Sequence, residues 1–248
     1  MQVVCTPLET YIVMELVSGG ELFDRIVAEG AYSEAAAAHL VAQILLALEY
    51  LHSKDIVHRD IKPENILYLA PGSHEIKLID FGYAGVWPAE RPLPGLCGTP
   101  EHVAPAVLTW YPDDDDAKGV PYGKASDLWS VGVLLFVILS GCSPFAADDE
   151  EKLLEAVAEA RYEFHDHEWK GVSEDAKDLI RKLLVVDPSK RLTMAQAFEH
   201  PFLKQAIIKC REARRRRRKP KSGKAARYAE GGSPDGETPG CHASCAIL

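Results

Sequence analysis

Two short polar motifs constrain the fold of this chain more than any other feature of its sequence. The first is His58-Arg59-Asp60-Ile61-Lys62-Pro63-Glu64-Asn65, and the second is Asp80-Phe81-Gly82. Apolar residues in helical spacing predict a long helix before the first motif, with Ser33 as its N-cap and an end near Ser53. The segment Lys77-Leu78-Ile79 before Asp80 predicts a strand. A loop and a strand end therefore both present oxygen-bearing side chains.

The residue types in the two motifs suit the transfer of a phosphoryl group. That reaction needs a carboxylate near the attacking hydroxyl, positive charge near the transferred group, and metal ions that bridge the phosphates. Asp60, Lys62 and Asn65 offer a proton acceptor, a cation and an oxygen ligand from one loop, and Asp80 offers a second oxygen ligand. Oxygen ligands without Cys or His partners favour Mg²⁺ or Mn²⁺ over zinc.

Three further motifs follow in order: GTPEHVAP at 98–105, DLWSVGV at 127–133 and DPSKRLT at 187–193. Together with the first two motifs they match the protein-kinase signature set. From about residue 8 to residue 203 the chain resembles a eukaryotic Ser/Thr protein kinase. The segments VMELVSGGELFDRI and LLVVDPSKRLTMAQAFEHPF are most similar to the calcium/calmodulin-dependent kinase group, checkpoint-kinase relatives included.

The resemblance implies a mainly α (α+β) protein-kinase-like fold, here the large C-terminal lobe with only the last strands of the small lobe. It implies transfer of the ATP γ-phosphate to Ser or Thr of protein substrates. Asp60 is then the proton acceptor, Lys62 contacts the γ-phosphate, and Asn65 and Asp80 hold Mg²⁺ (or Mn²⁺). The other implied nucleotide contacts are Met14, Glu15, Val17, Glu64 and Leu67.

Substrate and supporting residues follow from the same resemblance. Glu21 and Glu64 match positions that bind arginines upstream of the phosphorylated residue, so we expect an Arg-x-x-Ser/Thr preference. For Glu21 the alternative is a first-turn helix residue that only favours the helix dipole. Thr99 is expected near Asp60, where it helps to set the preference for Ser/Thr. Structural support is assigned to His58, Arg59, Phe81, Gly82, Asp127 and Arg191.

Outside the motifs, local patterns predict the remaining elements. Tyr11 to Val17 predicts a buried strand, and residues 81–123 are expected to be irregular. The apolar stretch Leu128 to Leu139 is too short to span a bilayer and predicts a buried core helix. Helices are predicted at 21–29, 126–140, 149–160, 173–184 and 193–199, and strands at 66–69 and 75–79.

The sequence departs from the family pattern at its start. No glycine-rich loop, strand lysine or helix glutamate precedes Tyr11. Those parts position the phosphates, so we expect the chain alone to bind ATP weakly and to turn over little. We interpret the chain as a fragment or an incomplete gene model. The alternative is a catalytically impaired kinase-like scaffold or regulatory fragment.

Two further departures affect the segment after Gly82. The family's Ala-Pro-Glu triplet reads Ala104-Pro105-Ala106, so Arg191 lacks its usual carboxylate and must find another acceptor or contact water. No Ser or Thr occurs between Gly82 and Cys97, so the usual phosphorylation site is absent. Arg59 then lacks a phosphate partner, and Glu90 is the candidate substitute.

Charge divides the chain into an acidic body and a basic arm. Residues 1–203 hold 33 acidic and 16 basic side chains, whereas residues 204–248 hold 4 and 12. We therefore predict a kinase domain at 1–203 and a basic, disordered tail at 204–248. The tail is a candidate ligand of calmodulin or of an anionic membrane, with a nuclear-localisation or phosphate-binding patch as the alternative. No specific binding of nucleic acid is predicted.

The last four residues, Cys245-Ala246-Ile247-Leu248, fit a C-a-a-X box for prenylation of Cys245. A single lipid anchors weakly, and acylation of Cys241 or the basic run is the expected second signal. The alternative is an accidental match. The cysteines form no CxxC pair, which favours reduced thiols and a cytoplasmic location, with the nucleus, or a membrane if Cys245 is prenylated, as alternatives.

Overall fold

The computed structural model describes residues 2–87, 97–108 and 123–218. The described residues divide into two units, one of residues 17–211 and the other of residues 2–16 with 212–218. The acidic run Asp113–Asp116 and Glu90 lie outside the described residues.

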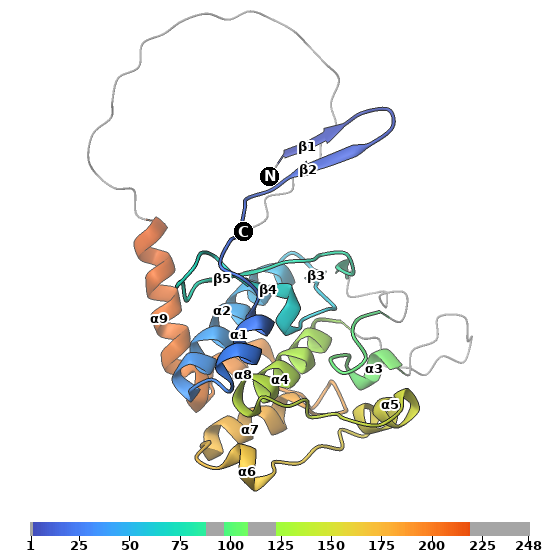
Figure 1. The fold of residues 1–248 in the computed structure, drawn as a ribbon, viewed down its shortest axis with the longest axis vertical. Helices are drawn as coiled ribbons and strands as arrows, with labels where there is room; N and C mark the ends of the chain where they lie inside the picture. Colours follow the sequence, from blue (N-terminus) through green and yellow to red (C-terminus); the bar gives the residue numbers. More distant parts are fainter. Residues whose placement is uncertain (1, 88–96, 109–122, 219–248) are drawn as a thin grey trace, which may run out of the picture. The chain divides into compact units, whose positions relative to one another are not determined.

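The N-terminal residues form a two-stranded antiparallel hairpin of β1 (Gln2–Cys5) and β2 (Thr10–Val13) (Figure 1). The prediction of a buried strand from Tyr11 to Val17 is wrong in extent and in burial. β2 ends at Val13, and the side chains of Tyr11 and Val13 are 51% and 55% exposed. Branched and aromatic residues favour a strand locally, but a two-stranded hairpin cannot cover its own faces.

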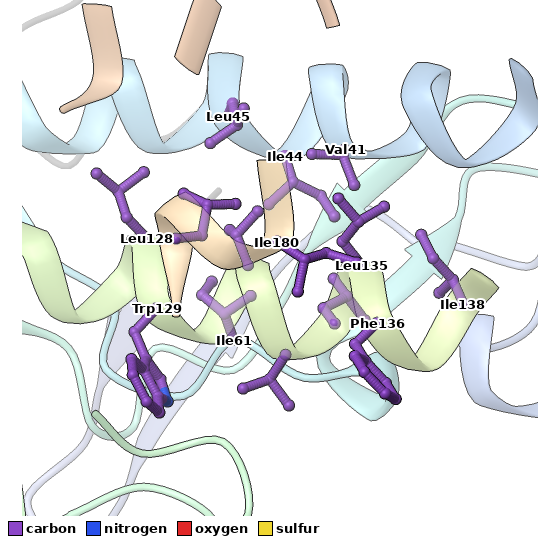
Figure 2. Close-up of a cluster of buried hydrophobic side chains, with 14 of the residues drawn as sticks. Val41, Ile44, Leu45, Ile61, Leu128, Trp129, Leu135, Phe136, Ile138 and Ile180 are labelled. Atoms are coloured by element: carbon purple, nitrogen blue, oxygen red, sulfur yellow. The ribbon is translucent and has the colours of Figure 1, made fainter. Parts of the chain in front are cut away.

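The larger unit is built around α4 (Lys124–Ser140), which contains the predicted core helix. Every residue from Ser126 to Phe136 is buried, so all faces of this helix are covered. α4 packs against α2 (Glu34–His52) and α7 (Glu174–Leu183). Figure 2 shows the layer between them, where Val41, Ile44 and Leu45 meet side chains of α4 and α7.

α2 begins as the sequence predicts. The Ser33 hydroxyl accepts a hydrogen bond from the backbone N–H of Ala36, and the helix ends at His52. By length and composition α2 is apolar enough to cross a membrane, but more than half of that stretch is buried inside the protein. α2 is therefore a core helix. Its Glu34 carboxylate accepts hydrogen bonds from the backbone N–H and the hydroxyl of Ser173, the N-cap of α7, and so ties the two helices together.

Short strands lie on both sides of the first polar motif. β3 (Ile56–Val57) pairs antiparallel with β6 (Gly85–Val86), and β4 (Ile66–Tyr68) pairs antiparallel with β5 (Ile76–Leu78). A 3₁₀ turn, η1 (Pro63–Asn65), joins the loop to β4. The predicted strands at 66–69 and 75–79 are confirmed. β3 and β6 were not predicted, because a strand of two residues is too short to show an alternating pattern in the sequence.

The remaining helices surround this core (Figure 1). The bounds are α1 (Leu22–Glu29), α3 (Pro105–Leu108), α5 (Glu150–Ala158), α6 (Asp166–Trp169), α8 (Met194–Glu199) and α9 (Pro201–Arg218). The helices predicted at 21–29, 149–160, 173–184 and 193–199 are confirmed as α1, α5, α7 and α8, within one or two residues at each end.

The first part of the predicted disordered tail is instead the helix α9. Leu203, Ile207 and Cys210 are buried and recur at helical spacing, so they form an apolar stripe. The Cys210 sulfur lies 3.5 Å from Nδ1 of His39 in α2, and Arg211 pairs with Glu49 at 3.0 Å. Packing against α2 therefore outweighs the basic composition of this segment. Residues 219–248 lie outside the described residues.

Gly132 allows α4 and α7 to pack closely. A Cβ atom at this position would lie 2.8 Å from Cβ of Leu183 and 3.0 Å from Cδ2 of Leu184. Such contacts are closer than van der Waals distance, and both neighbours are buried. A larger residue would therefore push the helices apart.

We predict that Gly132→Ala destabilises the protein although alanine is the better helix former. Overpacking of a close-packed core costs ~1–3 kcal/mol, which exceeds the ~1 kcal/mol that alanine gains in helix propensity. Urea unfolding followed by circular dichroism measures the change, and Gly132→Ser should lose more. A more stable Gly132→Ala variant would contradict the packing argument.

Candidate active site

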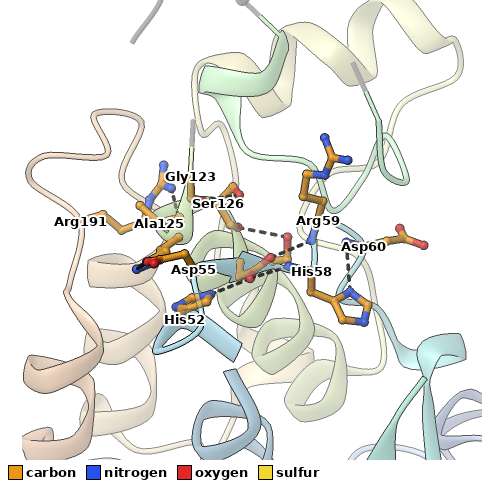
Figure 3. A network of polar contacts seen from close by, with 12 residues as sticks. His52, Asp55, His58, Arg59, Asp60, Gly123, Ala125, Ser126 and Arg191 are labelled. Carbon is orange, nitrogen blue, oxygen red and sulfur yellow. Dashed lines mark hydrogen bonds and ion pairs between the residues drawn. The ribbon is translucent and has the colours of Figure 1, made fainter. Parts of the chain in front are cut away.

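The buried carboxylate of Asp127 holds the loop that carries the first motif. Asp127, in the first turn of α4, accepts hydrogen bonds from the backbone N–H groups of His58 (3.1 Å) and Arg59 (2.9 Å). Its Oδ2 also lies 2.7 Å from Nε2 of His52. Figure 3 shows how this network joins the end of α2, the loop and the start of α4. The loop backbone is thereby fixed to the most buried helix of the unit.

The loop gathers three polar side chains around the carboxylate of Asp60. Oδ2 accepts a hydrogen bond from Nδ2 of Asn65 (2.8 Å) and lies 3.0 Å from Nζ of Lys62. Oδ1 accepts a hydrogen bond from the hydroxyl of Thr99 (2.9 Å), which in turn lies 2.8 Å from Nζ of Lys62. Asp60 is only 3% exposed. Four residues assigned from the sequence therefore form one cluster.

The environment of Asp60 keeps its carboxylate charged. Burial by itself raises the pKa of this group, but the hydrogen bonds from Lys62, Thr99 and Asn65 favour the charged form and hold the pKa of Asp60 below its usual value. The group is therefore an acceptor-only carboxylate near neutral pH. Such a group can orient a hydroxyl and accept its proton as negative charge moves away.

The second motif lies beside this cluster. The backbone N–H of Ile79 donates to the carbonyl of Asn65 (2.9 Å), and the Phe81 ring packs 4.9 Å from the ring of His58. The exposed carboxylate of Asp80 accepts a hydrogen bond from the backbone N–H of Gly82 (3.0 Å). The backbone thus brings the Asp80 and Asn65 positions together, while no direct contact joins these two described side chains.

Two residues of the site have backbone angles in the left-handed region, Arg59 with φ 70° and Asp80 with φ 58°. This conformation is uncommon for residues other than glycine. At Arg59 it is held by the bond to Asp127, and the Arg59 side chain donates from Nε to the carbonyl of Tyr83. Asp55 and Ala160 share this conformation outside the two motifs, so it is not confined to the site.

Asn65 and Asp80 offer the kind of oxygen ligands that Mg²⁺ prefers. Among residues 2–87, 97–108 and 123–218, no group of three or more His, Cys, Asp or Glu side chains is arranged to hold a metal ion. Mg²⁺ commonly takes one or two protein ligands and completes its shell with water and substrate phosphates. The donor set fits an ion of this kind and does not fit a metal cage built by the protein alone.

The residues expected around the nucleotide base and the substrate come from several elements. Leu67 is half-buried in β4, and a β-bridge pairs it with Glu21, which precedes α1. Glu64 is exposed in η1, and Val17 is half-buried. Met14 and Glu15 are exposed and belong to the unit with the hairpin, so they are not placed relative to Asp60.

Arg191 has the alternative acceptors that its missing carboxylate partner requires. It is 3% exposed, and its guanidinium donates to the backbone carbonyls of Ala125 (2.7 Å), Val185 (2.7 and 3.0 Å) and Val186 (3.3 Å). Burial lowers the pKa of Arg191 to about 10, with Asp187 acting in the opposite direction. Backbone carbonyls satisfy the hydrogen bonds but do not neutralise the charge.

Some assigned residues lie outside the described part of the chain. These are Cys241 and Cys245, the candidate lipidation sites, and Glu90, the expected partner of Arg59.

Two histidines of this region were not identified from the sequence as part of the site. His52 contacts Asp127, and its position on the last turn of α2, just before the loop, is the signal that could have indicated it. His102 is buried, and both its ring nitrogens lack a hydrogen-bond partner among the described residues. Burial lowers the pKa of His102 to about 4, so this ring is neutral near pH 7.

Comparison with known proteins identifies the family to which the chain is similar. Residues 1–203 match the family model described as protein kinase domain. The chain is 48% identical over 200 residues to myosin light chain kinase A of Dictyostelium discoideum, covering 80% of this chain and 65% of that protein. It is 46% identical over 199 residues to human calcium/calmodulin-dependent protein kinase type 1B, covering 80% and 55%. For human calcium/calmodulin-dependent protein kinase type IV the values are 44% over 200 residues, 80% and 40%.

The chain thus spans 40 to 65% of the length of these relatives. The family match covers most of this chain, and the relatives come from one group of kinases. The chain therefore belongs to the Ser/Thr protein kinase family, in the calcium/calmodulin-dependent kinase group.

Proposed function

We propose that this chain transfers the γ-phosphate of ATP to Ser or Thr hydroxyls of protein substrates. The observation that carries the proposal is the cluster around Asp60, in which a buried carboxylate is bonded to Lys62, Asn65 and Thr99. Family membership supports the reaction class. The roles of the individual residues are part of the same proposal.

Each member of the cluster has one role. Asp60 orients the substrate hydroxyl and accepts its proton. Lys62, half-buried and 3.0 Å from Asp60, places positive charge where the transferred group gathers negative charge. Thr99 holds one oxygen of Asp60 in place, and Asn65 holds the other. These contacts pre-orient the acceptor before substrate arrives.

Mg²⁺ bound with ATP would neutralise phosphate charge and favour in-line transfer. Asn65 and Asp80 are the residues that would hold it. The bond from the N–H of Ile79 to the carbonyl of Asn65 supports this pairing, because it keeps the two backbone positions adjacent. Leu67, Val17, Glu15 and Met14 are proposed to contact the adenine.

A basic substrate suits the surface charge of the chain. Residues 1–203 carry an excess of acidic side chains, and Glu64 is exposed next to the loop that carries Asp60. We propose that Glu64, with Glu21, pairs with arginine upstream of the phosphorylated residue. A guanidinium forms strong paired hydrogen bonds with a carboxylate.

The wider architecture and partners are also proposals. Residues 17–211 would form the large lobe of the kinase fold, and the β1–β2 hairpin would be the last part of the small lobe. The names of two relatives describe calcium/calmodulin dependence, and the basic end of α9 is the segment that we propose for calmodulin. Free cysteines among the described residues support a cytoplasmic location.

Asp60→Asn should slow phosphate transfer by ~10²–10⁴-fold without preventing nucleotide binding. Removing a general base typically costs ~10²–10⁴-fold in rate, and asparagine keeps the shape of the side chain. Transfer from radiolabelled ATP measures the rate, and a thermal shift with Mg²⁺-ATP measures binding. Asp175→Asn makes the same charge change on an exposed part of α7 and should leave both unchanged.

Normal activity in Asp60→Asn would overturn the role of Asp60. A wild-type chain that binds Mg²⁺-ATP but transfers no phosphate would favour the scaffold alternative.

Thr99→Ala should shift the acidic limb of the pH–rate profile to higher pH. The Thr99 hydroxyl donates to the charged form of Asp60, so its loss raises the pKa of that carboxyl and the base is protonated at higher pH. Values of kcat/KM measured across pH 4 to 9 test this, and Thr99→Ser should retain the wild-type limb. An unchanged limb in Thr99→Ala would exclude coupling between the two groups.

Glu64→Gln should raise KM for an Arg-x-x-Ser peptide by about fivefold, because an exposed ion pair contributes up to about 1 kcal/mol. A peptide with alanine in place of the arginine supplies the control, and its KM should be the same for both proteins. An equal rise for both peptides would mean that Glu64 acts on folding or on nucleotide.

A further inference from the structure

A cavity of about 110 Å³ lies at the first turn of α4, apart from the Asp60 cluster. Its walls include Trp87, Ala104, Ala106, Lys124, Pro188 and Arg191. One water needs only ~10–15 Å³ of such volume, so this cavity has room for a small organic ion. It joins four separate segments: Trp87 after β6, residues 104–106, the start of α4, and the loop before α8.

The charge in the cavity wall is positive and incompletely neutralised. Arg191 is buried, and among the described residues its four side-chain hydrogen bonds all go to backbone carbonyls. A guanidinium has five N–H donors, so one N–H on Nη1 remains. Asp187 acts on Arg191 only through space, since its own carboxylate bonds Ser189 and Lys190. Lys124 adds a second cation, paired with Asp55 at 2.7 Å.

A second donor in the wall also lacks an acceptor. The indole Nε1 of Trp87 is buried and makes no hydrogen bond within the described part of the chain. A buried donor without a partner destabilises the protein, and a ligand oxygen would supply the missing acceptor. The Trp87 ring packs closely on the backbone of Gly123, where an added Cβ would lie 2.8 Å from Cε2 of the ring. The start of α4 also favours an anion. Its N-cap Gly123 has no side chain to accept hydrogen bonds from the first backbone N–H groups of the helix, and the helix dipole places partial positive charge there.

Most of the remaining lining is apolar, made of Ala104, Ala106, Ala125 and the ring of Pro188. The exception is Ser126, whose hydroxyl donates to the carbonyl of Gly123 (2.7 Å). A ligand that matches this wall has one charged end and one small apolar end. A phosphate or sulfate ion would leave oxygens against these apolar groups without partners.

We propose that this cavity binds a small monocarboxylate of the size of acetate. The carboxylate accepts from the remaining N–H of Arg191 and from Nε1 of Trp87, and the methyl end packs among the alanines. The bound anion links residues 104–106, which follow Thr99 by a few positions, to α4 and to the buried Arg191. It therefore stabilises this part of the chain.

Thermal unfolding of the full chain in sodium acetate and in sodium chloride, at equal ionic strength and pH 7.5, tests the site. Acetate at 50 mM should raise the Tm by about 2–4 °C over chloride. Hydrogen exchange should slow at 99–108 and at the start of α4. Sodium phosphate at the same ionic strength tests an inorganic oxyanion.

Two variants at Ala106 separate specific binding from a general salt effect. Ala106→Glu places a carboxylate in the cavity, so it should be more stable than wild type in chloride and insensitive to acetate. Ala106→Gln has the same size without the charge, and should lose the response to acetate without the gain in stability. Trp87→Phe removes the indole donor and should weaken the acetate response several-fold, whether or not the Ala106 variants fold.

Equal Tm values in acetate and chloride would overturn the proposal. An acetate response that persists in Ala106→Gln or in Trp87→Phe would place the ion elsewhere and overturn it equally. A shift with phosphate as large as with acetate would overturn the choice of a monocarboxylate.

Discussion

The hydrogen bonds to the buried Asp127 carboxylate are the interaction on which the rest of the structure depends. A charged carboxylate in the core is costly unless donors surround it, and here the N–H groups of His58 and Arg59 and the ring of His52 do so. Because α4 is covered on all faces, these bonds fix the loop to a helix that is itself held rigidly in the core. Asp60 owes its place to a residue that need not touch substrate.

At the same end of α4, Arg191 is a buried positive charge that needs hydrogen-bond acceptors, as the buried Asp127 needs donors. It is a buried cation whose usual carboxylate is replaced by Ala106, and backbone carbonyls of α4 and of the loop after α7 accept its hydrogen bonds. Carbonyl dipoles are weaker than a full charge, so burial still lowers the pKa of Arg191. The cavity lined by Ala106, and a buried cation bonded only to backbone carbonyls, therefore lie together where α4 begins.

Much of the fold was predictable because the signals are local. Ser33 caps α2 as expected, and the apolar run of α4 was enough to indicate a core helix. The mistakes occurred where burial depends on partners. Tyr11 has strand propensity but only one partner strand, and the stripe Leu203, Ile207 and Cys210 is outnumbered by basic residues yet packs against α2. A short-range pattern shows that a segment can form a strand or a helix, but it cannot show whether tertiary contacts will bury that segment.

The sequence by itself determined the residue types of the candidate site: a carboxylate, a lysine and an amide on one short loop, followed by a strand-end aspartate, a set that suits phosphoryl transfer. It also determined most helices, because their periodicity is local. The family resemblance already implied that Asp127 supports the loop and that Thr99 lies near Asp60, and the tertiary structure supplied the atoms and distances of these contacts. Tertiary structure alone decided that Trp87 and Arg191 line one cavity. These contacts join segments far apart in the chain, and only the packing of helices against one another sets their distances.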